Sequence, residues 1–158
     1  MSDTGLMAGL YQHELMMQHI GPPLSLRQAT QLAQKLIQQS QCRQALVRLL
    51  FHQTEEAFAG LISLHWRDSL QAVEFGIMIR PEYQKHGLSR SALLPLMRQS
   101  GEFFTQPVQL LCCFIDKHNV SANEGCRKLG FQRVANLSNS ARHHNKNRWN
   151  VTMEQLNQ

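Results

Sequence analysis

A short polar turn holds residue types that can bind an anionic ligand. Residues 84–89 read Gln-Lys-His-Gly-Leu-Ser and precede a helical pattern. Gly87 lets the backbone come close to a ligand, and small Ser89 leaves space for that approach. Lys85 and His86 add positive or titratable groups. Because the first N–H groups of a helix lack internal partners and lie at its positive end, the turn predicts a phosphate-binding loop.

A strand and a helix are expected to position this turn. Residues 73–79 alternate apolar and other side chains, which suits a half-buried strand. Pro81 ends it, because proline cannot donate a hydrogen bond to a ladder. The helix expected over residues 90–99 contains Pro95 beyond its first turn, so we expect a kink or an early end there.

The rest of the pattern predicts an α/β (α+β) chain. Strands are expected over residues 45–52, 59–66, 73–79, 108–115, 131–137 and 148–156. Helices are expected over residues 6–20, from a capping box at Ser25 and Gln28, over residues 90–99, and from a capping box at Ser121 and Glu124 to Gly130. Short connections between the first three strands predict an antiparallel meander. No linker divides the chain, so we expect one domain over residues 1–158.

Two segments together resemble the GCN5-related N-acetyltransferase (GNAT) family. The first is Gln84-x-x-Gly87-x-Ser89 after a strand, which is similar to the family's acyl-CoA pyrophosphate loop. The second is NVSANEGCRKLGF over residues 119–131, where a strand ends near an Asn and a helix closes on Leu-Gly-Phe. The resemblance covers roughly residues 15–156. It implies a twisted, mixed, mostly antiparallel sheet flanked by helices.

Within the family, the chain resembles the ribosomal-protein-alanine (RimJ/RimL-like) subgroup. Its central strand reads Glu, an apolar residue and Gly, then an apolar pair and Pro-Glu-Tyr-Gln, and residues 74–84 of this chain read EFGIMIRPEYQ. There are departures from the family pattern. Its first strand has no visible counterpart here, Ser89 stands where Gly or Ala is usual, and its tyrosine general acid falls on Cys126.

The resemblance implies a cofactor site for acetyl-CoA, the cosubstrate, in an opening between the strands that end at Ile79 and Ile115. It implies as cofactor-binding residues the strand backbone of Ile77, Met78 and Ile79, the loop of Gln84, Lys85, His86, Gly87, Leu88 and Ser89, and the amide of Asn119. It also implies Glu74 as a general base acting through water, with Cys126 as a proton donor to the leaving thiolate.

Each assignment has a structural alternative. Glu74 could be a solvated carboxylate or a salt-bridge partner, Cys126 a buried core cysteine, and Asn119 a turn residue. A basic segment that includes Arg142, His143, His144, Lys146 and Arg148 could meet an acidic substrate or RNA. A solvated loop is its alternative.

Composition and charge indicate the class of protein, the kind of ligand and the cellular location to expect. The chain has 42% apolar and 17% charged residues, as ordinary globular proteins do. A net charge of +5 suits a polyanionic ligand such as CoA, a nucleic acid or the ribosome, but does not choose among them. The apolar runs are too short to span a membrane, and no signal peptide is visible. Because no C-x-x-C pair occurs, we expect reduced cysteines and no metal site. We also expect a cytoplasmic location.

The expected function is acetyl transfer from acetyl-CoA to a primary amine, on a small molecule or a protein N-terminus. The first alternative is a non-catalytic acyl-CoA-binding module of GNAT-like fold. The second is a basic module for nucleic acid or the ribosome, which ranks below it because no aromatic-rich RNA-binding signature is present. The missing first strand would leave an open sheet edge, so a homodimer is a further hypothesis.

Overall fold

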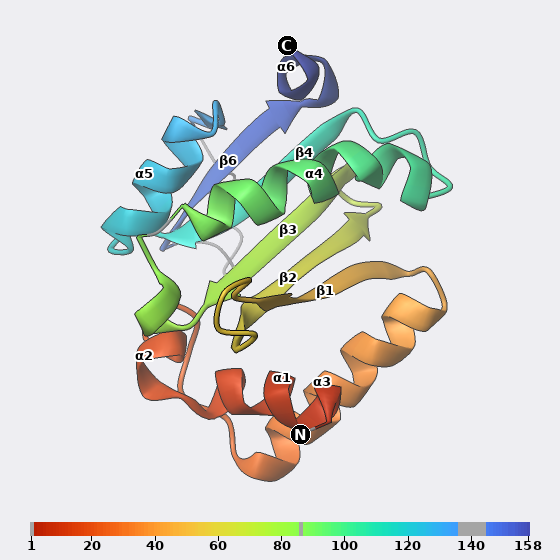
Figure 1. Cartoon of the computed structure of the whole chain (residues 1–158). Helices are drawn as coiled ribbons and strands as arrows, with labels where there is room; N and C mark the ends of the chain where they lie inside the picture. Colours follow the sequence, from red (N-terminus) through yellow and green to blue (C-terminus); the bar gives the residue numbers. More distant parts are fainter. Residues whose placement is uncertain (1, 86, 136–144) are drawn as a thin grey trace.

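The computed structural model describes residues 2–85, 87–135 and 145–158 (Figure 1). Its strands are β1 (Ala45–Phe51), β2 (Phe58–Arg67), β3 (Ala72–Ile79), β4 (Leu110–Asp116), β5 (Gln132–Arg133) and β6 (Lys146–Thr152). Its helices are α1 (Asp3–Gln12), α2 (Glu14–Met17), α3 (Leu26–Gln41), α4 (Leu88–Phe103), α5 (Val120–Lys128) and α6 (Met153–Asn157), with a 3-10 turn η1 (Pro81–Tyr83).

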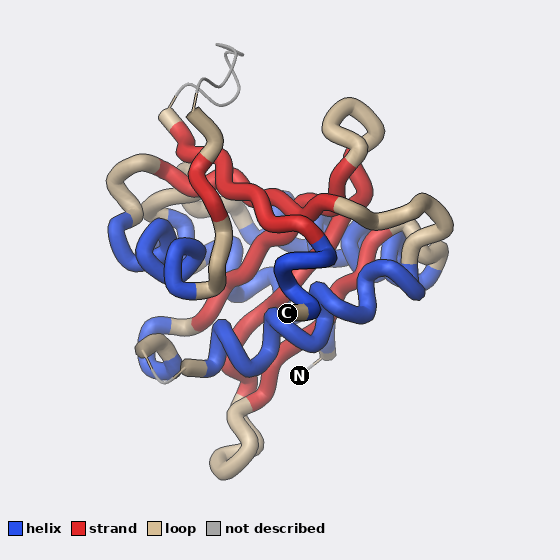
Figure 2. The backbone as a smooth tube through the Cα atoms, turned by 90° about the horizontal axis from the view of Figure 1, so that it is seen from above, coloured by secondary structure: helices blue, strands red, loops and turns tan. Residues whose placement is uncertain are grey.

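All the described strands form one sheet in the order β1-β2-β3-β4-β6-β5. The neighbours pair antiparallel except β3 and β4, which are parallel. The meander of the first three strands and the mixed, mostly antiparallel sheet are therefore confirmed. The strands twist across the sheet (Figure 2), as the handedness of extended chains requires. Among the described residues, no strand precedes α1.

Helices cover the sheet from two sides. In Figure 1, α4 lies in front of the sheet and α5 lies near β6, while α1 and α3 lie beside β1. One core is formed with α4 and α5 and includes Ile62, Phe75, Leu93, Met97, Leu111 and Trp149. The other is formed with α1 and α3 and includes Met7, Leu10, Leu36, Leu61 and Met78. Alternate residues of β2 and β3 thus enter opposite cores, which fixes the register of both strands.

The expected strands are confirmed, but the expectation for the last strand is wrong beyond Thr152. There Thr152 and Gln155 form a capping box that starts α6. β5 is shorter than expected, with two residues, and part of the segment expected as strand falls outside the described residues.

Two helix expectations are also corrected. The first helix is interrupted at His13, which ends α1 and precedes α2. Of the kink or early end expected at Pro95, the early end does not occur, since α4 continues to Phe103. None of the described helices is long and apolar enough to cross a lipid bilayer.

Candidate functional site

The polar turn lies between the end of β3 and the start of α4. The side-chain amide of Gln84 donates to the Ile79 carbonyl at 2.8 Å and fastens the turn to the strand. Lys85 and Gly87 both adopt left-handed backbone, with φ of 66° and 75°. Glycine adopts this conformation at little cost, whereas lysine adopts it rarely. His86 lies outside the described residues.

The first turn of α4 keeps free backbone donors. Its N-cap is Gly87, which has no side chain to accept from them. The first N–H groups that bond back to the Gly87 carbonyl are those of Arg90 and Ser91, and those of Leu88 and Ser89 have no partner among the described residues. Side-chain oxygens cap the other helices of five or more residues, namely those of Ser2, Ser25, Asn119 and Thr152. The start of α4 therefore differs from them in leaving donors available to an anion.

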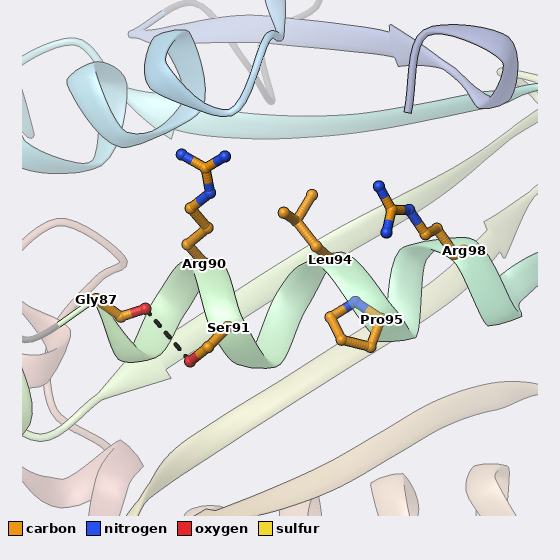
Figure 3. A pocket seen from close by; sticks show the side chains of 6 residues that line it. All are labelled: Gly87, Arg90, Ser91, Leu94, Pro95 and Arg98. Atoms are coloured by element: carbon orange, nitrogen blue, oxygen red, sulfur yellow. Dashed lines mark hydrogen bonds between the residues drawn. The ribbon is translucent and has the colours of Figure 1, made fainter. Parts of the chain in front are cut away.

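A groove of about 420 Å³ runs along α4 from this end. It is lined by Gly87, Arg90, Ser91, Leu94, Pro95 and Arg98. Figure 3 shows the side chains of Arg90 and Arg98 on the same side of the helix, with Leu94 between them. Arg98 is held by the Leu156 carbonyl of α6, at 3.2 and 3.0 Å. Arg90 has no hydrogen bond or ion pair with the described residues, so its charge is available beside the turn.

β3 and β4 pair at only two positions, Val73 with Leu111 and Glu74 with Cys112. Neither strand pairs with the other beyond these residues, although β3 runs on to Ile79. The backbone groups that β3 turns toward β4 in its second half thus lack a strand partner. This is where the sequence predicted an opening. Ile77 is half-buried there, and the side chains of Met78 and Ile79 are buried.

Glu74 lies where the paired part of β3 and β4 ends. Its Oε2 accepts from the Nε of Arg67 at 2.6 Å, and its side chain is 27% exposed. The salt-bridge alternative for Glu74 is therefore present in the structure. Oε1 accepts no hydrogen bond from the described residues, so one oxygen remains open to water or an amine. Arg67 thus fixes the direction of the carboxylate without occupying all of it.

His65 belongs to the strand expected over residues 59–66, and in the structure it lies opposite Glu74. The two residues are direct partners across β2 and β3, which places their side chains on the same face. Burial lowers the pKa of His65, and the Arg67 charge lowers it further, while Glu74 acts in the opposite direction. His65 is therefore neutral at pH 7. The alternation of side chains along the strand predicts which face His65 lies on. Its position opposite Glu74 follows only from the register of β2 and β3.

Cys126 lies in the core rather than at an open surface. It is 5% exposed, and its Sγ is 3.4 Å from the Sγ of Cys113 on β4. The Cys126 thiol hydrogen bond and burial raise the pKa of Cys113 well above its usual range. This environment supports the packing alternative for Cys126. Its role as a proton donor stays a proposal that the resemblance alone carries.

Asn119 is the N-cap of α5. Its side-chain oxygen accepts from the N–H of Ala122 at 3.1 Å. The capping box expected at Ser121 and Glu124 is wrong, because Ser121 lies inside the helix. Only the amide nitrogen of Asn119 remains for a ligand.

Sequence reasoning missed Asn123, which ties α5 to the sheet. Its side-chain oxygen accepts from Asn147 and from Trp149 Nε1, each at 2.9 Å. Its amide nitrogen donates to the carbonyls of Asp116 and Asn119.

The basic segment is only partly described. Arg142, His143 and His144 lie outside the described residues, whereas Lys146 and Arg148 belong to β6. No group of three or more potential metal ligands occurs in the described ranges.

Comparison with known proteins identifies the fold and the family. A model of the acetyltransferase (GNAT) domain matches residues 2–132. Among curated protein sequences, none matches the chain.

Several solved structures share the fold at low sequence identity. A spermidine N-acetyltransferase from Vibrio cholerae, solved with CoA and spermine, is 17% identical, with a TM-score of 0.77, and the match covers 99% of this chain and 93% of that one. The ribosomal-protein α-N-acetyltransferase RimL is 19% identical, with a TM-score of 0.73 and coverage of 95% and 86%. The self-immunity acetyltransferase MccE, solved with acetyl-CoA and AMP, is 13% identical, with a TM-score of 0.74 and coverage of 94% and 86%.

Proposed function

Because the chain belongs to the acetyltransferase (GNAT) family, we propose that it transfers an acetyl group from acetyl-CoA to a primary amine. Protein N-termini are the first acceptors to test. The observation that carries this proposal is the divergence of β3 and β4 directly after Glu74, beside a helix whose first donors are uncapped. A thioester held along the unpaired part of β3 would reach the one carboxylate at the end of the paired part.

The turn and α4 fit the diphosphate of the cosubstrate. The N–H groups of Leu88 and Ser89 have no acceptor among the described residues and can donate to phosphate oxygens, and the positive end of α4 favours negative charge. Arg90 adds a cation without an ion-pair partner among the described residues. Gln84 contributes indirectly to phosphate binding, because its side-chain amide donates to the Ile79 carbonyl and so holds the turn in place. Lys85 is exposed beside the turn and could contact phosphate as a point charge.

The backbone of β3 supplies the next requirement. Attack of an amine on a thioester carbonyl puts negative charge on the carbonyl oxygen, and a fixed N–H donor stabilises that charge. The stretch from Ile77 to Ile79, which pairs with β2 but not with β4, is the source of such donors. Their side chains anchor the strand in the cores, so the donors would be held in place before the reaction.

Glu74 supplies the base. An α-amino group has a pKa of about 8, so at pH 7 most of it must lose a proton before it can attack. The open Oε1 of Glu74 can take that proton directly or through a water molecule. The amine nitrogen then forms the new bond to the acetyl carbon and loses a second proton, while the bond from that carbon to sulfur breaks. The leaving thiolate takes up one proton, so that CoA departs as a thiol.

Removal of the base tests this proposal. A thiol-release assay with acetyl-CoA and a panel of amines and N-terminal peptides should detect turnover of at least one acceptor. Glu74→Gln should lower kcat/KM by about 100-fold, within the range expected for a general base. The loss should shrink above about pH 9, where the α-amino group is already neutral. Glu124→Gln is the matched control, because Glu124 is also paired with an arginine, Arg127 at 2.9 Å, but lies on α5.

The alternative of a non-catalytic acyl-CoA-binding module gives a different result. Such a module would bind acetyl-CoA without turnover of any acceptor, and Glu74→Gln would change nothing measurable. Binding without thiol release across the whole panel would therefore contradict the proposed function.

A further inference from the structure

We propose that the acceptor is a peptide N-terminus followed by acidic residues, and that Arg148 binds their carboxylates. This inference rests on the proposed acetyl transfer at Glu74 and names the class of acceptor for the same site.

The strand register places Arg148 on the face of the sheet that carries Glu74. Glu74 pairs with Cys112, so both point to one side. Phe114 follows two residues later on β4 and therefore shares that side, and its partner across β6 is Arg148. Charge effects on the buried Cys112 thiol agree, since both Arg148 and Arg67 oppose the rise in its pKa, to about 11, that burial causes.

The guanidinium of Arg148 is held in a position from which it can bind a carboxylate. Its guanidinium lies over the ring of Phe114, with 5.9 Å from its carbon to the ring centroid. Its Nε donates to the side-chain oxygen of Asn150 at 3.0 Å. Its two terminal nitrogens have no hydrogen-bond partner among the described residues, and the side chain is half-buried. Because Nε fixes one edge of the guanidinium, the two terminal nitrogens at the other edge can donate to the two oxygens of a carboxylate.

The charge on this face disfavours a polycationic acceptor. Glu74 is the base, and Arg67 already balances its charge. Asp116, at the end of β4 on the same side, accepts from the His118 N–H with Oδ1 and from the Asn145 amide with Oδ2. The described part of the face therefore offers no unengaged carboxylate for a second ammonium group, while Arg148 offers an unengaged cation.

Strand geometry indicates where the acidic residue should lie. Arg148 is two strands from Glu74 and two residues along, which gives roughly 12 Å between their backbones at strand spacings of about 4.8 Å. An extended peptide rises about 3.4 Å per residue, so an amine at Glu74 would bring its third or fourth residue to Arg148.

A peptide series measures this preference. Peptides of equal length share an N-terminal Ser and carry Asp-Glu, Asn-Gln or Lys-Lys at positions three and four. With the full chain and saturating acetyl-CoA, the acidic peptide should have a kcat/KM about 10-fold above the neutral one, and the basic peptide should be the poorest. The preference should weaken in high salt, because these side chains are partly exposed to solvent.

Charge variants test the role of Arg148. Arg148→Gln should reduce the ratio of acidic to neutral kcat/KM to near 1, and Arg148→Glu should make the basic peptide the better acceptor. Arg133→Gln is the control, because Arg133 pairs with Trp149 and so lies on the opposite face, and it should keep the ratio. The inversion by Arg148→Glu requires a folded, active enzyme, so loss of fold cannot imitate it.

Two results would overturn the inference, and they separate it from the proposed function. Equal kcat/KM for acidic and neutral peptides, or a preference for the basic one, contradicts the acidic acceptor while acetyl transfer stands. If none of the peptides and none of the amines gives thiol release, both proposals are contradicted.

Discussion

Single residues near the end of the paired part of β3 and β4 have connected roles. Arg67 fixes the Glu74 carboxylate at 2.6 Å, and His65 lies opposite Glu74 in a form that is neutral at pH 7. The family resemblance indicated Glu74, because it matches the acidic residue of the strand before the phosphate loop. It could not assign His65 or Arg67 to the site, because their approach depends on the pairing of β2 with β3. The turn that sets this pairing includes Gln71 with φ of 46°, a conformation that a glutamine rarely adopts.

His65 predicts a pH dependence of stability. Its folded-state pKa is lowered by burial and by Arg67, so the unfolded chain takes up a proton at a higher pH than the folded one. The free energy of unfolding should therefore decrease as the pH falls below about 6.5, the usual histidine pKa. Urea unfolding at pH 7.5, 6.5 and 5.5 measures this, and His65→Gln should show a weaker decrease. Identical slopes for both proteins would contradict the environment assigned to His65.

Cys126 gives a test that separates packing from catalysis. Cys126→Ala removes a buried thiol and its contact with Cys113, so the free energy of unfolding should fall by about 1 kcal/mol. The kcat for the best acceptor should remain within about twofold of the wild type, because the thiol is enclosed in the core. A decrease in kcat of tenfold or more at unchanged acetyl-CoA affinity would instead support proton donation.

The elements around the turn show why part of the site could be predicted. The alternation in β3, the break at Pro81 and the glycine before α4 each have a local physical cause, so the strand, turn and helix appear in the sequence. Ser121 and Asn119 show the limit of that reasoning. Both can cap a helix, and the choice depends on where β4 ends, which the local sequence does not specify. The same holds at Thr152, where strand and helix patterns overlap.

Two glycines test whether the left-handed start of α4 is needed. A Cβ would meet nothing within 4 Å at either Gly87 or Gly125, but only Gly87 has a left-handed φ, of 75°. Gly87→Ala should therefore strain the turn and weaken acetyl-CoA binding by about 10-fold, with a loss of about 1 kcal/mol in stability. Gly125→Ala should stabilise α5 by about 0.5 to 1 kcal/mol and leave binding unchanged. Titration calorimetry and thermal unfolding give both quantities, and equal effects of the two variants would contradict the role of Gly87.

The described chain combines two cores, one on each face of the sheet, with a proposed active site where the paired part of two strands ends. Three of the four cysteines are buried, and Cys42 is exposed. The fold class could be predicted from the resemblance and from alternation. The face that carries Arg148 could not, because it is created by strands far apart in the sequence.

Cysteine labelling checks this burial directly. A thiol reagent at pH 8 should react rapidly with one cysteine per folded chain, Cys42, and with all four after unfolding. Burial raises the pKa of Cys112 to about 11, and the hydrogen bond with Cys126 together with burial raises the pKa of Cys113, so their thiolates are scarce at pH 8. Cys42→Ser should abolish the rapid reaction. Rapid labelling of Cys113 or Cys126 in the folded chain would contradict the described core.

Binding of acetyl-CoA is the most direct test of the central claim, that the start of α4 and the diverging strands hold this cosubstrate. Thermal unfolding should be measured with acetyl-CoA, with ATP as a control that shares the phosphates and adenine, and without ligand. At about 100 times its Kd, acetyl-CoA should stabilise the fold by about 2.7 kcal/mol, which raises Tm by roughly 5 to 10 °C. ATP should raise it less. An unchanged Tm at millimolar acetyl-CoA, with the chain folded, would contradict the account.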